Sequence, residues 1–348
     1  MLEIKNLNVQ RGSFFLDDIC LDVQDGEYFI LLGPTGAGKT VLLESIAGTY
    51  GISGGEVRID GRNVTSLNLQ QRRIGFAYQD YVLQRHLPVR DNISFGMTWR
   101  YKTRREIEEA VDQVIELLDL QSLLEKRPWS LSGGESQKIC LARAIGIKPD
   151  LLLLDEPLGS VDLESREVTE RQLKEMHNRL KLTTIHVTHD FEEAIAMGDR
   201  IAVMIGGRIV QTGTPDEVFR HPNSEVVARF LMTRNIFEGE VQNGTGSQSA
   251  FCLDGEKLAV VTPLWGKRHA SIRPEDISIS KEPPVSNAVN SLPGIISRIS
   301  DRGSIVYVHI NAPPEFTCLL LHSSLEEMGL EEGQRVYVTF KVSVVNIF

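Results

Sequence analysis

The sequence predicts an α/β domain followed by a smaller, all-β domain. The first part contains apolar strands at 28–32 and 151–154, the first leading into a glycine-rich turn and the second into two carboxylates. Residues 104–119 repeat apolar side chains with a period near 3.6, which indicates an amphipathic helix. Beyond residue 235 this periodicity stops, and short strands separated by turn residues take over. Since 348 residues exceed what one hydrophobic core usually serves, we expect a domain boundary near residue 235.

The N-terminal strands lead into the central motif of the chain. Residues 2–9 and 19–32 alternate or run apolar around the turn Asp25–Gly26, and another short strand is expected at 55–61. These segments predict a small antiparallel sheet that precedes the motif.

The clearest motif lies between the strand at 28–32 and an apolar-periodic helix. It reads Gly-Pro-Thr-Gly-Ala-Gly-Lys-Thr and fits G-x-x-x-x-G-K-S/T at every fixed position. Because glycine lacks a Cβ, the backbone can wrap closely around a polyphosphate, and the positive helix N-terminus favours the anion. An ordinary glycine-rich turn is the alternative, but the flanking strand and helix are the context that the motif requires. The expected nucleotide-binding residues are Gly33, Pro34, Thr35, Gly36, Ala37, Gly38, Lys39 and Thr40.

Two further strands end in residues suited to catalysis. The strand at 151–154 leads into Asp155 and Glu156, which is the form expected of a metal-coordinating strand beside such a loop. The strand at 184–188 leads into His189 and an acidic helix start. A structural or solvent-facing histidine is the common case, but ligands of open α/β sheets bind at the carboxyl ends of the strands, which supports a function for His189.

Two other segments place polar residues at the end of a strand or the start of a helix. The buried strand expected at 74–79 ends in the amide Gln79. At 130–137 a cap residue and two glycines precede a helix that continues to Ile145, so this helix N-terminus also suits phosphate.

Composition and charge narrow the class of protein. Hydrophobic residues make up 41% and charged residues 24%, which are ordinary values for a globular protein. No apolar run reaches the roughly 18 residues of a membrane-spanning helix. The N-terminus enters a strand without a signal peptide, so we expect an intracellular chain. The four cysteines are far apart, which indicates neither a zinc site nor a disulfide framework, and a net charge of −10 argues against a general nucleic-acid binder.

In this order the motifs resemble the ATP-binding cassette (ABC) ATPase family. The resemblance rests on the glycine loop at 33–40, Gln79, the LSGG run at 131–134, Asp155–Glu156, Ser160–Asp162 and His189. It covers residues 1–235 and implies a P-loop NTPase fold with a helical subdomain at about 80–148. It also implies ATP and Mg²⁺ as cofactors and a head-to-tail homodimer. Each ATP would lie between one subunit's glycine loop and the other subunit's LSGG helix.

The resemblance implies a role for each matched residue. Thr40, Gln79 and Asp155 are expected at Mg²⁺, with Asp155 binding through water. Glu156 is expected to polarise the attacking water, and His189 to contact the γ-phosphate. Gln79 is also expected to link the site to a partner protein. The expected catalytic residues are Glu156, His189 and Gln79, and those of the opposing surface are Ser132, Gly133, Gly134 and Gln137.

Two departures from the family pattern lie near the nucleotide. Arg11 occupies the position where an aromatic ring usually stacks on adenine. An arginine plane can also stack, and Phe14 or Phe15 is an alternative, so this assignment stays open. The contact loop, commonly Ser-Ala-Leu-Asp, reads Gly-Ser-Val-Asp at 159–162, which keeps the acid expected at the dimer contact, Asp162.

The resemblance favours an importer over other members of the family. The spacing from Gln79 to Ser132 leaves no room for the coiled coil of a DNA-repair engine, and no membrane helices are fused to the ATPase as in exporters. A separate integral-membrane permease is therefore implied, together with an extracytoplasmic substrate-binding protein. The chain would be peripheral on the cytoplasmic face of the membrane. The loop at 80–90 resembles the element on which a permease helix docks, and an ordinary surface loop is the alternative.

The C-terminal part, residues 236–348, is expected to be a small OB-like β-barrel that is regulatory by analogy. Residues 272–277 resemble an element of importer ATPases, and residues 285–348 resemble the molbindin-type module that binds molybdate or tungstate. Val289 and Leu321 replace the usual arginine and threonine, so a structural barrel without an oxyanion is the alternative. Hydroxyls and one lysine suit a tetrahedral dianion. The candidate oxyanion residues are Ser286, Asn290, Ser324, Lys341 and Ser343.

The sequence thus predicts the ATP-hydrolysing subunit of an importer for molybdate or tungstate, with oxyanion feedback through the C-terminal domain. The same engine for sulfate, iron, a sugar or a polyamine is the first alternative. A soluble ATP-dependent switch without a permease is the second.

Overall fold

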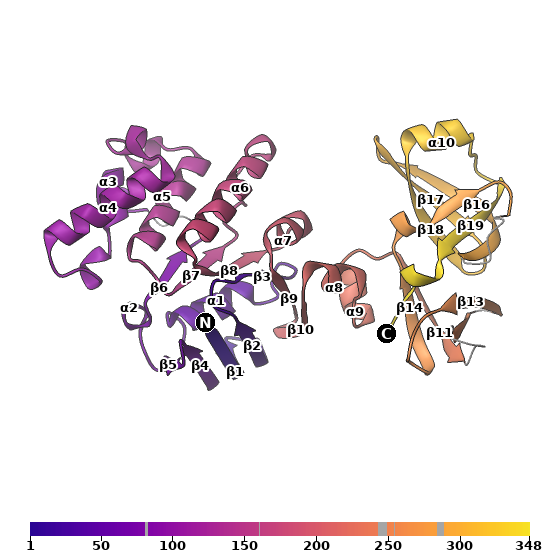
Figure 1. Cartoon of the computed structure of the whole chain (residues 1–348), viewed down its shortest axis with the longest axis horizontal. Coiled ribbons are helices and arrows are strands. Elements are labelled where there is room, and N and C mark those ends of the chain that lie inside the picture. Colours follow the sequence, from indigo (N-terminus) through magenta and orange to yellow (C-terminus); the bar gives the residue numbers. More distant parts are fainter. Residues whose placement is uncertain (81–82, 160, 243–248, 254, 284–288) are drawn as a thin grey trace. The chain divides into compact units, whose positions relative to one another are not determined.

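The chain is divided into two compact units, Met1–Val218 and Phe219–Phe348 (Figure 1). The structure is a computed structural model, and it describes residues 1–348 except 81–82, 160, 243–248, 254 and 284–288. Each unit has its own apolar core. The units are therefore described separately.

A six-stranded sheet forms the centre of the first unit. Its strand order is β10-β9-β3-β8-β7-β6, and all neighbouring strands are parallel except β9 and β10. The strands are β3 (Tyr28–Leu32), β6 (Ile74–Ala77), β7 (Leu151–Asp155), β8 (Thr183–Thr188), β9 (Arg200–Ile205) and β10 (Arg208–Gly213). Every residue of β3, β7 and β8 is buried, as expected of parallel strands that are covered on both faces. The carboxyl ends of these strands therefore meet at one edge.

A four-stranded antiparallel sheet with the order β2-β1-β4-β5 completes the β-structure of this unit. Its strands are β1 (Leu2–Arg11), β2 (Phe14–Val23), β4 (Gly54–Ile59) and β5 (Arg62–Asn63). Residues of both sheets, among them Leu7, Ile19 and Phe29, belong to one apolar core. The predicted antiparallel sheet is confirmed, but the Asp25–Gly26 turn divides the segment 19–32 between two sheets.

Helices surround the central sheet, and three of them follow β6 in the chain and pack on one another: α3, α4 and α5 (Figure 1). The amphipathic helix predicted at 104–119 is confirmed as α4, which begins at a Thr103–Glu106 capping box. The helices of this unit are α1 (Lys39–Ala47), α2 (Leu69–Arg72), α3 (Val89–Ser94), α4 (Arg104–Leu118), α5 (Gly133–Gly146), α6 (Leu163–Leu180) and α7 (Phe191–Met197), and α8 (Pro215–Arg220) spans the division between the units. Short 3₁₀ turns lie at Met97–Trp99 (η1), Gln121–Leu123 (η2) and Pro128–Ser130 (η3). Among the described residues, no helix is long and apolar enough to cross a membrane.

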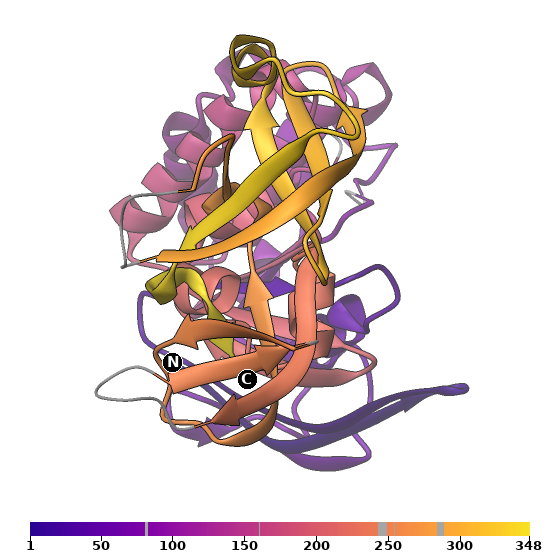
Figure 2. The same cartoon turned by 90° about the vertical axis from the view of Figure 1, so that its right-hand side faces the viewer.

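Two five-stranded antiparallel sheets form the second unit (Figure 2). Their strand orders are β13-β12-β11-β14-β20 and β15-β19-β16-β17-β18. The strands are β11 (Asn235–Gln242), β12 (Ser249–Leu253), β13 (Glu256–Val260), β14 (Gly266–Ile272), β15 (Ser278–Ser280), β16 (Val289–Asp301), β17 (Ile305–Asn311), β18 (Glu315–Leu321), β19 (Arg335–Lys341) and β20 (Asn346–Ile347). One core around Phe251, Phe316 and Phe340 joins the two sheets, so the predicted β-domain is confirmed.

Short helical segments of the second unit were not predicted. These are α9 (Glu225–Phe230), α10 (His322–Met328) and the 3₁₀ turns η4 (Pro274–Asp276) and η5 (Val342–Val344). The unit begins upstream of the expected residue 235 because its first segment packs on the strands. Helix α9 contacts β11, and the Pro222 carbonyl accepts a hydrogen bond from the Asn346 amide at 2.8 Å.

Candidate nucleotide-binding site

Four strands of the central sheet bring the predicted catalytic residues to one edge. The glycine loop follows β3, Gln79 follows β6, Asp155 ends β7 and His189 follows β8. Strand β8 lies between β3 and β7, and β7 pairs with β6. Residues separated by more than a hundred positions in the chain therefore become neighbours.

The loop after β3 has a shape that only glycine permits at three positions. Gly36 and Gly38 have φ angles of +82° and +102°, in the left-handed region. A Cβ on Gly33 would lie 2.3 Å from the Met204 carbonyl oxygen, and one on Gly38 would lie 2.5 Å from the ring of Phe14. The loop is thus packed closely between β9 and β2, and it delivers the N-terminus of α1 to the site.

The remaining loop residues differ in what they offer to a phosphate. Pro34 and Thr35 are exposed. Ala37 is buried, and its N–H donates to the Pro34 carbonyl at 3.1 Å, so this residue closes the loop. The first N–H groups of α1, which begins at Lys39, have no acceptor within the helix and are the free donors of this region.

The Lys39 ammonium lies at the mouth of the loop. Its Nζ donates to the carbonyls of Gly33 at 2.7 Å and Pro34 at 3.0 Å. Burial lowers the pKa of Lys39, and the nearby carboxylates of Glu156 and Asp155 raise it in the opposite direction. The Lys39 ammonium is therefore held between the loop and the carboxylates of Glu156 and Asp155.

Thr40 and Asp155 form an oxygen-rich pair beside Lys39. The Thr40 hydroxyl donates to Asp155 Oδ1 at 3.2 Å. Burial raises the pKa of Asp155, and the hydrogen bond from Thr40 lowers it in part. A hydroxyl and a carboxylate are hard oxygen donors of the kind that Mg²⁺ prefers. The predicted metal residues Thr40 and Asp155 thus lie together, whereas Gln79 is hydrogen-bonded elsewhere.

Glu156 has two side-chain partners and an unusual backbone. Its φ of 45° lies in the left-handed region, where residues other than glycine are uncommon, and its N–H donates to the Val187 carbonyl at 3.0 Å. Gln79 Nε2 donates to Glu156 Oε2 at 3.1 Å, and His189 Nδ1 lies 3.0 Å from Oε1. The three predicted catalytic residues therefore form one hydrogen-bonded group.

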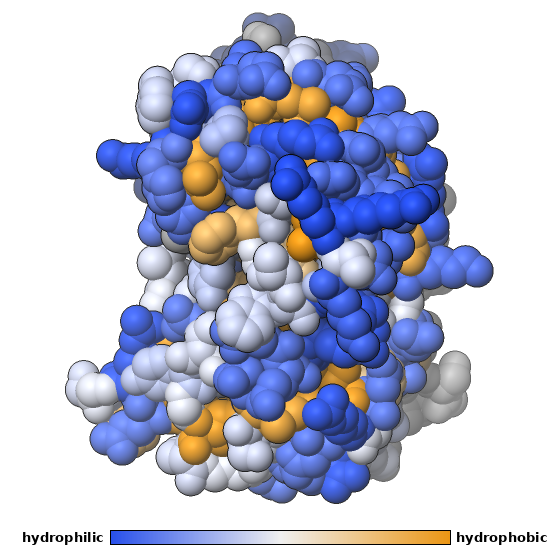
Figure 3. All heavy atoms as spheres, turned by 90° about the vertical axis from the view of Figure 1, so that its left-hand side faces the viewer, coloured by the Kyte–Doolittle hydropathy of each residue, from blue (hydrophilic) through white to orange (hydrophobic). Residues whose placement is uncertain are grey.

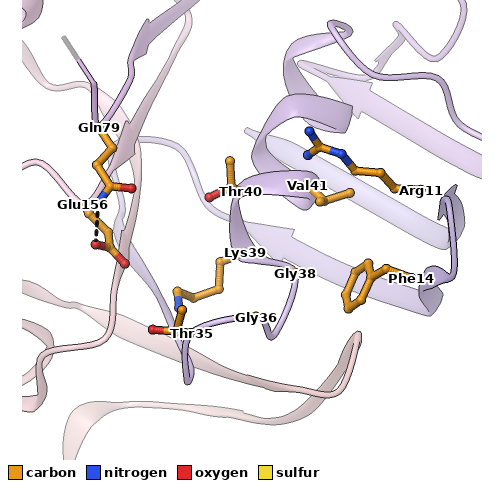
Figure 4. A pocket seen from close by; sticks show the side chains of 10 residues that line it. All are labelled: Arg11, Phe14, Thr35, Gly36, Gly38, Lys39, Thr40, Val41, Gln79 and Glu156. Atoms are coloured by element: carbon orange, nitrogen blue, oxygen red, sulfur yellow. Dashed lines mark hydrogen bonds between the residues drawn. The ribbon is translucent and has the colours of Figure 1, made fainter.

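A cavity of about 330 Å³ opens over the loop, Gln79 and Glu156 (Figure 4). Figure 4 shows Arg11 and Phe14 on the opposite side of the loop from Gln79 and Glu156. Phe15 is exposed and does not line the cavity, so Arg11 and Phe14 remain as candidates for adenine contact. The described residues that line the cavity are Arg11, Phe14, Thr35, Gly36, Gly38, Lys39, Thr40, Val41, Gln79 and Glu156.

The two remaining candidates for adenine contact already have neighbours in the structure. Arg11 Nη1 lies 3.2 Å from Glu44 Oε2, and its guanidinium carbon lies 5.3 Å from the Tyr50 ring centre. The Phe14 ring packs against Gly38. If Arg11 stacks on adenine, its guanidinium is already held in place by Glu44 and the Tyr50 ring.

Ser132 begins α5 at the surface of the unit. Its hydroxyl accepts from the Glu135 N–H at 3.2 Å, and Glu135 Oε2 accepts from the Ser132 N–H at 2.8 Å. Gly133 is exposed and Gly134 is half-buried. The LSGG segment thus presents a capped helix N-terminus to solvent.

Gln137 does not share this exposed surface, which corrects the expectation. Its side chain is only 5% exposed, and it faces a small internal cavity together with Tyr78. Within the described part of the chain its Oε1 has no hydrogen-bond partner. The sequence contained the signal, because Gln137 shares the helical face of Cys140 and Leu141, which are buried.

A second group of polar residues, not predicted from the sequence, fixes the turn that carries His189. The Thr188 hydroxyl donates to Glu193 Oε2 at 2.6 Å and accepts from the Asp190 N–H at 3.0 Å. Arg166 Nη1 donates to Asp190 Oδ2 at 2.6 Å. Helix α6, which carries Arg166, is capped by Asp162, whereas Ser160 of the same loop lies outside the described residues.

The candidate oxyanion residues that the structure describes lie on four elements, β16, α10, β19 and η5, of which β16, β19 and η5 adjoin one another. Asn290 is buried, and its amide exchanges hydrogen bonds of 2.7 and 2.9 Å with the backbone of Ala259. Ser324 lies on α10, which contacts β17 and β18, whereas Lys341 is exposed at the end of β19 and Ser343 lies in η5, which contacts β13. Ser286 lies outside the described residues. Spacing along the chain did not reveal that these residues belong to different elements.

Comparison with known proteins matches this division of the chain. The family of ABC transporters matches residues 16–159, and the TOBE domain family matches residues 286–347. The chain is 39% identical to the molybdate/tungstate import ATP-binding protein WtpC of Pyrococcus horikoshii, over 100% of both chains. It is 36% identical to the sulfate/thiosulfate import ATP-binding protein CysA of Bacillus cereus, over 97% of this chain and 95% of that protein. The chain belongs to the ABC transporter family of ATP-binding proteins.

Solved structures agree with this assignment. A bacterial ABC transporter cassette, solved as a dimer in a post-hydrolysis state with ADP and Pi, superimposes with a TM-score of 0.56 and 26% identity. The match covers 62% of this chain and 99% of the cassette. The predicted fold is thereby confirmed, and this member of the ABC family is an ATPase that binds nucleotide.

Proposed function

We propose that this ABC ATPase drives the import of molybdate or tungstate through a separate permease. The observation that carries this proposal is the full-length identity of 39–40% to molybdate/tungstate import ATP-binding proteins of two Pyrococcus species. Sulfate is the second candidate, because sulfate/thiosulfate import ATP-binding proteins are 36% identical over nearly the same length.

The glycine loop and Lys39 would bind the phosphates of ATP. The first N–H groups of α1 lie at this cavity and have no acceptor within the helix. The Lys39 ammonium, which lies 2.7 Å from the Gly33 carbonyl oxygen, lies at the same cavity. Thr40 and Asp155 would hold Mg²⁺, since their oxygens already lie 3.2 Å apart and Asp155 is buried. When bound, Mg²⁺ neutralises charge that develops on the phosphates.

Glu156 would polarise the attacking water, because it lines the cavity and is not paired with Thr40. Gln79 and His189 each hold one of its oxygens and so orient the carboxylate. Because His189 Nδ1 faces Glu156, the Nε2 atom is the one left to contact the γ-phosphate. A hydrogen bond from Nε2 to phosphate while Nδ1 donates to Glu156 requires the protonated ring.

The site would be completed by a second copy of the chain. Ser132 and Gly133 are exposed at the N-terminus of α5, where a helix end favours an anion. The related solved cassettes are dimers. We infer a head-to-tail arrangement in which this helix end meets the ATP of the partner copy.

A groove in the first unit supports docking of a permease. It has a volume of about 420 Å³ and lies between residues of α2 and β6 and residues of the α3–α5 region. Phe95 and Trp99 line it and are 50% and 73% exposed, which is unusual for large apolar side chains. The side of the unit that carries α2 and α4 faces the viewer in Figure 3, where apolar surface lies between hydrophilic areas.

This groove also includes Gln84 of the predicted docking loop 80–90, whereas residues 81–82 lie outside the described residues. An amphipathic helix with an apolar face would suit such a groove. The chain would then be peripheral on the cytoplasmic face of the membrane, bound to its permease.

Purification of the chain from its own host with any integral-membrane partner tests the proposal. The assembled transporter would be placed in proteoliposomes with its substrate-binding protein, which is loaded with molybdate, tungstate or sulfate. We expect ATP hydrolysis to be stimulated by the molybdate- and tungstate-loaded protein. Stimulation only by the sulfate-loaded protein would contradict the proposed cargo. If no membrane protein co-purifies with the chain, the soluble ATP-dependent switch is favoured instead.

Oxyanion feedback through the second unit stays a prediction. Addition of millimolar molybdate or tungstate to the assembled transporter should lower its ATP hydrolysis. Unchanged hydrolysis would contradict the feedback.

A further inference from the structure

A polar cavity of about 190 Å³ lies entirely within the second unit. Residues that line it come from the segment before β11, from β14, from η4 and from η5. Its charged and hydroxyl-bearing lining includes Arg220, Thr233, Ser271, Arg273, Asp276 and Ser343. The cavity shares no residue with the nucleotide site.

Two guanidinium groups face this cavity around one carboxylate. Burial raises the pKa of Asp276, as does Glu275, while Arg220 and Arg273 lower it, so both cations act on the same acid. Arg273 Nε lies 2.7 Å from Glu275 Oε1, which orients the guanidinium and leaves its other donors for a ligand. The lining therefore combines two guanidinium groups with one carboxylate.

Two buried hydroxyls add unused hydrogen-bonding capacity. Ser271 is 3% exposed and Thr233 is 9% exposed, and both line the cavity. Neither hydroxyl has a hydrogen-bond partner among the residues that the structure describes. These hydroxyls are therefore available to a ligand or to water in the cavity.

Guanidinium and hydroxyl donors together suit a small tetrahedral oxyanion. Asp276 narrows the choice of oxyanion, because an ionised carboxylate can accept hydrogen bonds but cannot donate them. Sulfate and molybdate carry no proton at neutral pH and would be repelled by it. Inorganic phosphate keeps one proton and can donate it to Asp276 in a hydrogen bond.

We propose that this cavity binds inorganic phosphate in preference to fully deprotonated oxyanions. Arg220, Arg273 and the two hydroxyls would donate to the phosphate oxygens, and Asp276 would accept from its remaining proton. The proposal does not depend on the transported cargo, and its failure would leave the nucleotide site untouched.

Equilibrium binding of inorganic phosphate to the full chain tests this site. The glycine loop must be filled with a saturating non-hydrolysable ATP analogue and Mg²⁺, because the loop itself can bind phosphate. We expect one phosphate to bind per chain under these conditions. Sulfate and molybdate should bind about tenfold more weakly or worse, because each lacks one hydrogen bond to a charged group. No phosphate binding, or tighter binding of sulfate or molybdate, would overturn the proposal.

Variants with matched controls identify the cavity. Ser271→Ala removes one hydroxyl and should weaken phosphate binding about tenfold. Thr339→Val is the control, since the Thr339 hydroxyl is also buried and unpartnered among the described residues but does not line the cavity. Equal effects of the two variants would contradict the assignment.

Asp276→Asn tests the discrimination itself. An amide can donate to a deprotonated oxyanion, so this variant should gain affinity for sulfate while losing affinity for phosphate. Unchanged selectivity would overturn the role of Asp276. Thermal unfolding of each variant, compared with that of the parent chain, confirms that the second unit is folded.

Discussion

Glu156 combines a left-handed backbone with a carboxylate that is held at both oxygens. Its φ of 45° lies in the left-handed region, and strained residues of this kind are commonly found at functional sites. Gln79 and His189 hold the side chain at 3.1 and 3.0 Å. At the scale of single residues, this acid is the one that the fold orients most completely.

Glu156→Gln should retain ATP binding and slow hydrolysis by about a hundredfold or more, the usual contribution of a general base. The amide keeps the size of the side chain but cannot accept a proton from water. Single-turnover hydrolysis and equilibrium ATP binding separate the two effects. Glu192→Gln, an exposed acid on α7 outside the cavity, serves as control, and equal turnover of the two variants would refute the assignment.

Lys39→Ala should instead weaken nucleotide binding, by about ten- to a hundredfold, because charge-assisted hydrogen bonds to phosphate are lost. The variant also removes the hydrogen bonds to Gly33 and Pro34, so its thermal unfolding must be compared with that of the parent chain. Fluorescence titration with a labelled ATP analogue measures the effect. Lys102→Ala, at an exposed lysine before α4, should bind as the parent does.

At the scale of elements, the turn between β8 and α7 determines where His189 lies. The Thr188 hydroxyl joins the Asp190 N–H to the Glu193 carboxylate within this turn, and Arg166 ties Asp190 to α6. His189 itself is exposed, and its side chain is paired with Glu156. These hydrogen bonds therefore fix the position of His189, although none of them involves its side chain.

Thr188→Val should lower kcat about tenfold while the KM for ATP changes little, because the turn loses the hydroxyl that orders it. Thr184→Val is a matched control on the same strand, since it removes a buried hydroxyl that lies 3.0 Å from His177 Nδ1. Steady-state kinetics of both variants provides the comparison. If both lose activity to the same extent, the effect is one of strand stability and the positioning role is wrong.

At the scale of the whole molecule, the sequence predicted the fold class and the nucleotide motif well. The loop at 33–40, the acids at the end of β7 and the histidine after β8 could be found because each follows a segment that was predicted to be a strand. The meeting of these strand ends follows from parallel-sheet topology. Periodicity also located α4, since its buried face repeats regularly.

Features that depend on distant contacts could not be predicted in this way. The sequence did not show that Arg11 faces Glu44 and Tyr50, or that Thr188 meets Glu193, because side-chain partners depend on the folded geometry. The five oxyanion candidates were chosen by residue type, and those that the structure describes fall on different elements. The burial of Gln137, in contrast, could have been predicted, because it shares a helical face with Cys140 and Leu141.

The central claim of this account is that two copies of the chain enclose ATP between the glycine loop of one and the α5 N-terminus of the other. Light scattering of the Glu156→Gln chain, with and without ATP and Mg²⁺, measures this association directly. We predict a monomer without nucleotide or with ADP and a dimer with ATP and Mg²⁺, lost when Lys39→Ala is added. A mass that stays that of one chain at saturating ATP would contradict the account.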